Sequence, residues 1–167
     1  ERHDSSGGVI ECVVNGMPAG IGDPVFQKLD ARLASAIMSI GAVKGIEIGD
    51  GFGVSTSTGS TNNDAFTTEH GKVPKKTNHS GGILGGMSDG SPIILRAAIK
   101  PTPSISSIQE TITQSHKPTS IQIKGRHDPV IVPRAVVVVE SMTAITLVDL
   151  LFTNMSARMD RLIDFYR

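Results

Sequence analysis

The stretch RAVVVVESMTAITLVDLLF (Arg134–Phe152) decides the fold because it is almost continuously apolar. Its four consecutive valines, Val136–Val139, by themselves favour a strand. The length of the stretch instead favours a helix that is buried on most sides. We therefore predict a helix, which begins either at Asp128-Pro129 or at Pro133, since proline is tolerated in a first turn.

Upstream of this helix the sequence alternates between strand and helix signals. Short apolar, β-branched stretches predict strands at Val9–Val14, Val43–Ile48 and Ile93–Ile99. Between the first two, Asp23-Pro24 is typical of a helix start, and the helix is predicted from Pro24 to Ile40. Its apolar residues recur at helical spacing: Phe26, Leu29, Leu33, Ile37 and Ile40.

Three other segments complete the predicted organisation of residues 1–167 as a single domain. Residues 49–80 are rich in glycine, serine, threonine and asparagine, which indicates a long functional loop or a mobile flap. Ile105–Gln122 predicts one or two short strands. The amphipathic tail, Met155–Arg167, is expected to pack on this domain or on a partner subunit.

Composition excludes several classes of function. Lysine plus arginine and aspartate plus glutamate number 16 each, and aromatic residues make up 4%, so a nucleic-acid-binding surface is not expected. No apolar run approaches the roughly 20 residues of a membrane span. The histidines lack metal-site spacing, and Cys12 in its apolar run is expected to be a buried small hydrophobe rather than a nucleophile.

Candidate binding residues occur in three short segments. GGILGG (Gly81–Gly86) can bring its backbone close to a ligand, although an ordinary tight turn explains the same glycines. KPTPS (Lys100–Ser104) combines a cation with two hydroxyls on a stiff backbone, which suits a phosphate or a ring carbonyl; a strand-ending loop with a solvated lysine is the alternative.

GRHDP (Gly125–Pro129) places a guanidinium, an imidazole and a carboxylate in consecutive residues. Arg126 offers a planar fork for a phosphate or carboxylate, and Arg134 adds a second cation at the start of the long helix. Asp128 before proline is also an ordinary helix cap, and His127 between two charges is also an ordinary surface histidine. Together with Lys100, these cations suggest a ligand with several negative charges.

The order of these motifs resembles the C-terminal part of chorismate synthase over nearly the whole chain. The matching segments are DSSGG (Asp4–Gly8), GMPAGIGDPVFQKLDA (Gly16–Ala31), VKGIEIGDGF (Val43–Phe52), NHSGGILGGMSDG (Asn78–Gly90), KPTPS, GRHDP and Pro133-Arg134-Ala135. The resemblance implies an α+β fold, a β-α-β sandwich with helices packed between antiparallel sheets. It also implies a cytoplasmic, homotetrameric lyase of the shikimate pathway for aromatic amino acids.

The activity that the resemblance implies is a 1,4-anti elimination that converts 5-enolpyruvylshikimate 3-phosphate to chorismate and phosphate. Reduced FMN is required without net redox change, and NADPH is implied only if the full enzyme reduces its own flavin. By resemblance, Asp128 is the catalytic residue that assists proton transfer near the flavin N5, and Arg134 contacts the substrate. The residues that would bind the flavin are Gly41, Ala42, Gly85, Lys100, Pro101, Thr102, Pro103, Ser104 and Arg126.

The chain lacks the family segments that supply the two catalytic histidines and most substrate-binding arginines. We therefore expect it to need the missing N-terminal half as a partner, to be inactive alone and to bind FMN weakly or not at all. Two alternatives are a non-catalytic phosphate- or flavin-binding module and an oligomerisation domain whose apolar helices pair with identical copies.

Overall fold

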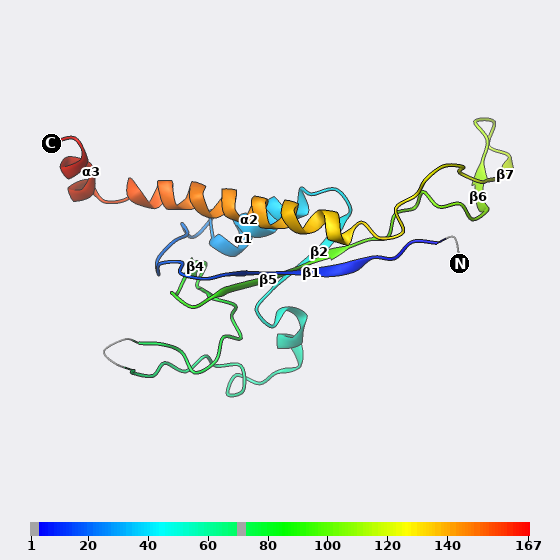
Figure 1. The fold of residues 1–167 in the computed structure, drawn as a ribbon. Coiled ribbons are helices and arrows are strands. Elements are labelled where there is room, and N and C mark those ends of the chain that lie inside the picture. The colour runs from blue at the N-terminus through cyan, green and yellow to red at the C-terminus, as the bar shows by residue number, and fades with distance from the viewer. Residues whose placement is uncertain (1–3, 70–72) are drawn as a thin grey trace.

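The computed structural model describes residues 4–69 and 73–167, whose centre is a three-stranded antiparallel sheet (Figure 1). The strands are β1 (Gly8–Val14), β2 (Val43–Ile48) and β5 (Ile93–Ile99), in the order β1-β5-β2. All three predicted strands are confirmed. Each consists largely of β-branched and other apolar residues, which suit a pleated surface packed on one face.

The central strand divides its side chains between the two faces of the sheet. Ile93, Leu95, Ala97 and Ile99 are buried, and Ile94, Arg96 and Ala98 between them are more exposed. Side chains alternate along a strand, so the buried set points to one face, where the helices lie. The core of the molecule therefore lies between this face and the helices.

The first helix, α1 (Leu29–Met38), is shorter than predicted. Leu29, Leu33 and Ile37 are fully buried, which confirms the central part of the predicted apolar stripe. The predicted start at Asp23-Pro24 is wrong. Asp23 and Gln27 exchange two backbone hydrogen bonds of 2.9 Å, which close a tight loop, and Phe26 is 89% exposed.

The long helix, α2 (Val132–Met155), confirms helix over strand for the valine-rich stretch. It begins one residue before Pro133, so the second of the two proposed starts is correct. The Asp128-Pro129 start is wrong because that segment is extended and Pro129 accepts a hydrogen bond from the backbone amide of Ser6.

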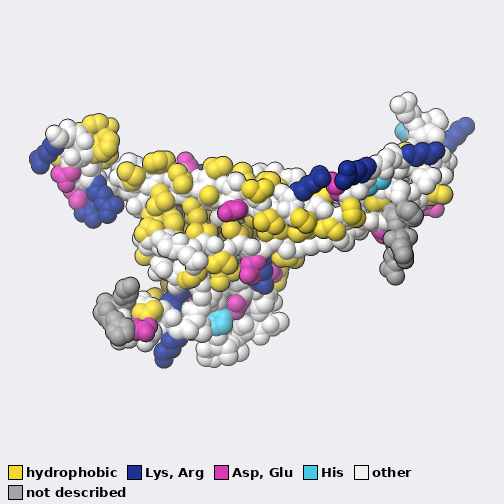
Figure 2. Space-filling model, viewed as in Figure 1, with side chains coloured by type: hydrophobic (Ala, Val, Ile, Leu, Met, Phe, Trp, Pro, Cys, Tyr) yellow, Lys and Arg dark blue, Asp and Glu magenta, His cyan; other side chains and the backbone are white. Residues whose placement is uncertain are grey.

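Only one face of α2 is buried among the described residues. Val139, Thr143, Leu147 and Leu150 pack against the sheet and α1, as does Thr146. The opposite side is solvent-exposed, so burial on most sides is wrong for this part of the chain. We call Val137, Ile145, Val148 and Phe152 the outer α2 face; Figure 2 shows hydrophobic side chains gathered along this helix.

The length of α2 also corrects the expectation that no apolar run approaches a membrane-spanning length. Its 24 residues, with a mean hydropathy of 2.0 in the best window, are enough for a span by length and composition alone. One such helix is weak evidence for a membrane, because core helices meet the same criterion. In this structure one face of α2 packs on the sheet, and 28% of that window is buried.

The remaining elements are small and lie around this centre. They are η1 (Gly51–Thr56), β3 (Ile83–Leu84), β4 (Met87–Ser88), β6 (Gln109–Ile112), β7 (Pro118–Ile121) and α3 (Met159–Phe165). The β6–β7 pair confirms the two short strands predicted in the serine- and threonine-rich segment. No residue of α3 is buried against the described chain, so packing of the tail on a partner stays a prediction.

The α+β class is confirmed: two helices cover one face of an antiparallel sheet, and two small hairpins flank it. The β6–β7 hairpin and the start of α2 lie at one end of the molecule, and the β3–β4 hairpin lies toward the other (Figure 1). Candidate residues near the start of α2 therefore lie apart from those in the β3–β4 hairpin.

Candidate functional site

The KPTPS segment begins where β5 leaves the sheet, beside the turn that enters β2. The backbone amide of Lys100 donates a hydrogen bond of 2.9 Å to the carbonyl of Ala42. Ala42 has a φ of 69°, in the left-handed region that alanine rarely adopts. The structure thus brings Gly41-Ala42 next to Lys100 and holds the turn in an uncommon conformation.

The N-terminal residues connect KPTPS to GRHDP. The hydroxyl of Ser5 donates a hydrogen bond of 2.6 Å to the carbonyl of Thr102, and the backbone amide of Ser6 donates one of 2.8 Å to the carbonyl of Pro129. Two segments that are about 25 residues apart in the sequence are therefore held by the same short stretch before β1.

His127 makes a second connection between these segments. Its Nδ1 lies 3.2 Å from the hydroxyl of Ser104, and its Nε2 lies 3.1 Å from the carbonyl oxygen of Ile123. The ring is half-buried and both of its nitrogens are engaged. The sequence left open whether His127 is an ordinary surface histidine, and the structure gives it a defined place between the two motifs.

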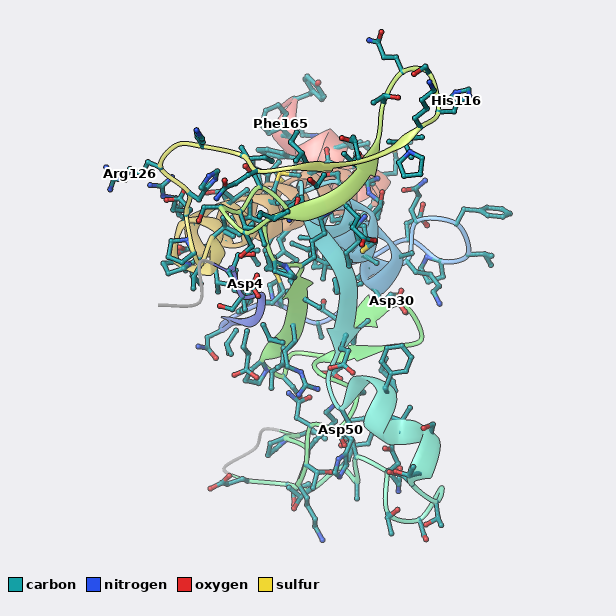
Figure 3. All side chains as sticks on the ribbon, turned by 90° about the vertical axis from the view of Figure 1, so that its right-hand side faces the viewer. Asp4, Asp30, Asp50, His116, Arg126 and Phe165 are labelled. Carbon is teal, nitrogen blue, oxygen red and sulfur yellow. The ribbon has the colours of Figure 1, made fainter. Side chains whose placement is uncertain are left out.

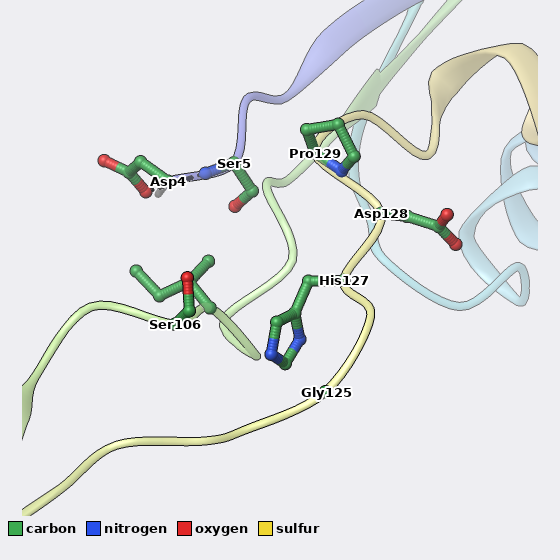
Figure 4. A pocket seen from close by; sticks show the side chains of 8 residues that line it. Asp4, Ser5, Ser106, Gly125, His127, Asp128 and Pro129 are labelled. Carbon is green, nitrogen blue, oxygen red and sulfur yellow. Dashed lines mark hydrogen bonds between the residues drawn. The ribbon is translucent and has the colours of Figure 1, made fainter. Parts of the chain in front are cut away.

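A depression of about 280 Å³ lies between GRHDP, the N-terminal residues and the loop that follows KPTPS (Figure 4). It is lined by Asp4, Ser5, Ile105, Ser106, Gly125, His127, Asp128 and Pro129. Figure 4 shows the side chain of Asp128 directed away from the imidazole of His127.

The charges around the depression are unevenly paired. Arg134 Nη1 lies 2.8 Å from Asp128 Oδ2, so these two groups form an exposed ion pair. Lys100 and Arg126 are exposed, and neither side chain forms an ion pair with any residue the structure describes. Figure 3 shows Arg126 directed outward from its loop. Two cations therefore remain available for an anion.

Gly85 does not join this group. It lies in the β3–β4 turn, and the carbonyl of its neighbour Gly86 accepts a 2.8 Å hydrogen bond from the amide of Leu29, the first residue of α1. Gly41 and Ala42 follow the other end of α1. The 10 residues of that helix span about 15 Å, so the two places are well separated. A flavin contact by Gly85 stays a prediction that this part of the molecule does not support.

The sequence analysis missed a buried ionic cluster in the loop between β2 and β5. Lys75 Nζ lies 2.6 Å from Asp89 Oδ2, 3.3 Å from Asp64 Oδ2 and 3.0 Å from Ser80 Oγ, and its side chain is 3% exposed. The spacing of these residues gives no recognisable motif. Only the rule that a buried charge needs partners, applied to coordinates, identifies them.

Hydrogen bonds set the protonation state of Asp64 in this cluster. Burial alone would raise the pKa of Asp64, but the amide and hydroxyl of Ser80, the hydroxyl of Thr77 and the amide of His79 all donate to it and hold that pKa well below its usual range. The cluster therefore fixes the chain just before GGILGG. Mobility of residues 49–80 stays a prediction.

The comparisons with known proteins agree with one another. A family model described as chorismate synthase matches residues 1–152. A chorismate synthase of Agathobacter rectalis is 67% identical over 164 residues, which cover 98% of this chain and 45% of the relative. One of Methanococcoides burtonii is 58% identical over 150 residues, covering 89% of this chain and 41% of the relative.

A solved structure described as chorismate synthase matches with a TM-score of 0.73 and 33% sequence identity, covering 96% of this chain and 44% of that one. The chain thus spans less than half the length of the curated relatives that it matches.

Proposed function

Because the chain belongs to the chorismate synthase family, we propose that it forms part of an active site that converts 5-enolpyruvylshikimate 3-phosphate to chorismate and phosphate. One observation carries the proposal: Ala42, KPTPS and GRHDP, which are distant in the sequence, are brought together by hydrogen bonds. They lie beside a depression that is lined by GRHDP, the N-terminal residues and the two residues that follow KPTPS.

The residues present fit a phosphate-bearing ring such as FMN. Lys100 and Arg126 supply positive charge without an ion-pair partner in the described residues, and the hydroxyls and backbone groups of Thr102 and Ser104 supply polar contacts. We infer that these residues, with Gly41, Ala42, Pro101 and Pro103, hold the flavin. When bound, reduced FMN would provide transient electron donation to the elimination, with no net redox change.

Asp128 is the proposed catalytic residue. Arg134 occupies its Oδ2, which leaves Oδ1 without a partner among the described residues and able to accept a proton. Beside the flavin N5, this ionised carboxylate would accept the proton of that nitrogen and so assist cleavage of the substrate C–H bond indirectly. Arg134 is the proposed substrate contact, and its pairing with Asp128 means that a substrate anion must compete with that carboxylate.

The test is a chimera in which this chain replaces the matched 164 residues of the Agathobacter rectalis relative. With prereduced FMN, the chimera is expected to form chorismate, whereas the chain alone is not. Asp128→Asn in the chimera is expected to lower kcat by at least about 100-fold, the lower range for loss of a general acid or base.

The matched control is Asp160→Asn, which removes the same charge in α3, outside residues 1–152. It is expected to leave turnover unchanged. Full turnover of the Asp128→Asn chimera would exclude the proposed role, and an inactive chimera that binds FMN would exclude the proposed reaction.

A second candidate is a non-catalytic phosphate- or flavin-binding module, or an oligomerisation domain. The exposed outer α2 face favours assembly. FMN titration separates the enzyme from the binding module. Binding that appears only in the chimera, where the rest of the relative is present, supports the enzyme. Tight binding by the chain alone supports the non-catalytic module. A cytoplasmic homotetramer, with NADPH serving only for flavin reduction, is the assembly that we propose for the complete enzyme.

A further inference from the structure

The contacts of His127 determine where its proton lies. The carbonyl oxygen of Ile123 can only accept a hydrogen bond, so Nε2, at 3.1 Å, must carry a hydrogen to bond to it. A neutral imidazole carries a single N–H. The other nitrogen, Nδ1, therefore keeps its lone pair and acts as an acceptor.

This assignment determines the direction of the Ser104 hydroxyl in turn. Ser104 Oγ lies 3.2 Å from Nδ1, and only an O–H donated by Ser104 can satisfy a nitrogen that has no hydrogen. A hydroxyl has one hydrogen. With that hydrogen directed at His127, Ser104 has only its oxygen lone pairs to offer a ligand.

We propose that His127 is a positioning residue: as the neutral Nε2–H imidazole it holds KPTPS against GRHDP and makes Ser104 a hydrogen-bond acceptor toward the ligand. The inference rests on the proposed function for the ligand itself. It adds the chemical class that Ser104 recognises, which is an N–H or O–H donor of the ligand, such as a ring imide.

This arrangement divides the recognition between residues. A phosphate oxygen needs donors, and a serine that has already donated its hydrogen cannot supply one. Lys100 and Arg126, which are donors only, remain for the anionic part of the ligand. The sequence suggested that both hydroxyls of KPTPS suit a phosphate. With Ser104 acting only as an acceptor, the hydroxyl of Thr102 is the one that can donate a hydrogen bond to a phosphate oxygen.

The test measures the tautomer directly, in the whole chain without ligand. Histidine-selective ¹⁵N labelling gives two nitrogen signals for each of the five histidines, and His127→Asn identifies those of His127. At about pH 8, the Nε2–H form of His127 is expected to dominate over the Nδ1–H form. Dominance of the Nδ1–H form would overturn the proposal.

Ser104→Ala and Ser106→Ala form a matched pair for the second half of the test. Both serines lie in the same loop, and Ser106 lines the depression without a side-chain hydrogen bond to His127. Loss of the Ser104 donor is expected to shift the Nδ1 signal and to raise the ratio of Nδ1–H to Nε2–H by about 2- to 10-fold, from the worth of a neutral hydrogen bond.

Ser106→Ala is expected to leave both signals in place. No change with Ser104→Ala, or an equal change with both variants, would overturn the proposal. A circular dichroism spectrum of each variant checks that it is folded. Because no flavin or substrate is present, an inactive chimera would refute the proposed function and leave this result unaffected.

Discussion

Lys75 holds its ammonium group against three oxygens while its side chain is almost fully enclosed. Lys75→Met is expected to destabilise the fold by about 3–5 kcal/mol, because it leaves Asp64 and Asp89 buried without their cation. Denaturant unfolding followed by circular dichroism measures the change. Lys76→Met, at an exposed neighbour, is the control and is expected to stay within about 0.5 kcal/mol.

The same cluster predicts sensitivity to acid. Burial alone would raise the pKa of Asp89, but Lys75 and Ser91 lower it, and the pKa of Asp64 is also lowered. A lowered pKa means that the stabilisation is complete above the unfolded value of about 3.9 and is lost as the pH falls through the folded pKa.

We therefore expect the free energy of unfolding to fall below about pH 4 and to depend less on pH in Asp64→Asn. Urea unfolding at a series of pH values measures this slope. If the free energy of unfolding had the same pH dependence in the variant and the parent, Asp64 would not contribute to the sensitivity to acid.

At the scale of residues, the sequence indicated candidate site residues, which stay a prediction, but it did not indicate the buried charges that support the structure. KPTPS and GRHDP carry their chemistry in consecutive residues, so their groups could be identified without coordinates. The partners of Lys75 are 11 and 14 residues away along a loop without periodicity. No local pattern indicates that such charges meet, because the path of the loop brings them together.

At the scale of elements, the buried stripe of α1 holds the helix to the sheet. Leu33→Ala is expected to reduce the free energy of unfolding by about 2–5 kcal/mol, since Leu33 is fully buried. Phe26→Ala is the control. It removes a larger side chain from the stripe predicted by the sequence, and it is expected to have little effect because Phe26 is 89% exposed. If both variants lowered the midpoint of thermal unfolding equally, Phe26 would belong to the buried stripe, as the longer predicted helix requires.

The elements themselves could mostly be predicted because each depends on local pattern. β-branched stretches became strands, and the long apolar stretch became α2 despite its four valines. The start of α1 could not be predicted, because Asp-Pro is typical of a helix start and the competing loop depends on a pair of backbone hydrogen bonds between Asp23 and Gln27. Pro133 succeeded where Pro129 failed because the amide of Ser6 holds the Pro129 carbonyl in an extended segment.

At the scale of the whole molecule, the outer α2 face leaves four large apolar side chains in solvent. We expect the isolated chain to sediment as a species larger than its 17.6 kDa monomer. Val137→Asp with Val148→Asp, about three turns apart on this face, is expected to restore the monomer. The matched control is Val9→Asp with Val13→Asp on exposed positions of β1. Monomeric parent protein would contradict this expectation.

The arrangement of the whole molecule was the part that sequence patterns predicted least. They gave the strands but not their order, in which the last of the three lies between the other two. They also grouped Gly85 with Lys100, although the length of α1 separates their surroundings. Both features depend on contacts between distant segments, which local propensity does not encode.

The position of β5 has a consequence for how the protein is made. β1 and β2 have no bonds to each other, and both pair with a strand that begins at Ile93. While a ribosome is still extending the chain toward that residue, the two earlier strands and the apolar side of α1 have no sheet to join. We therefore expect closure of this core to wait until synthesis has passed β5, the strand that also leads into KPTPS.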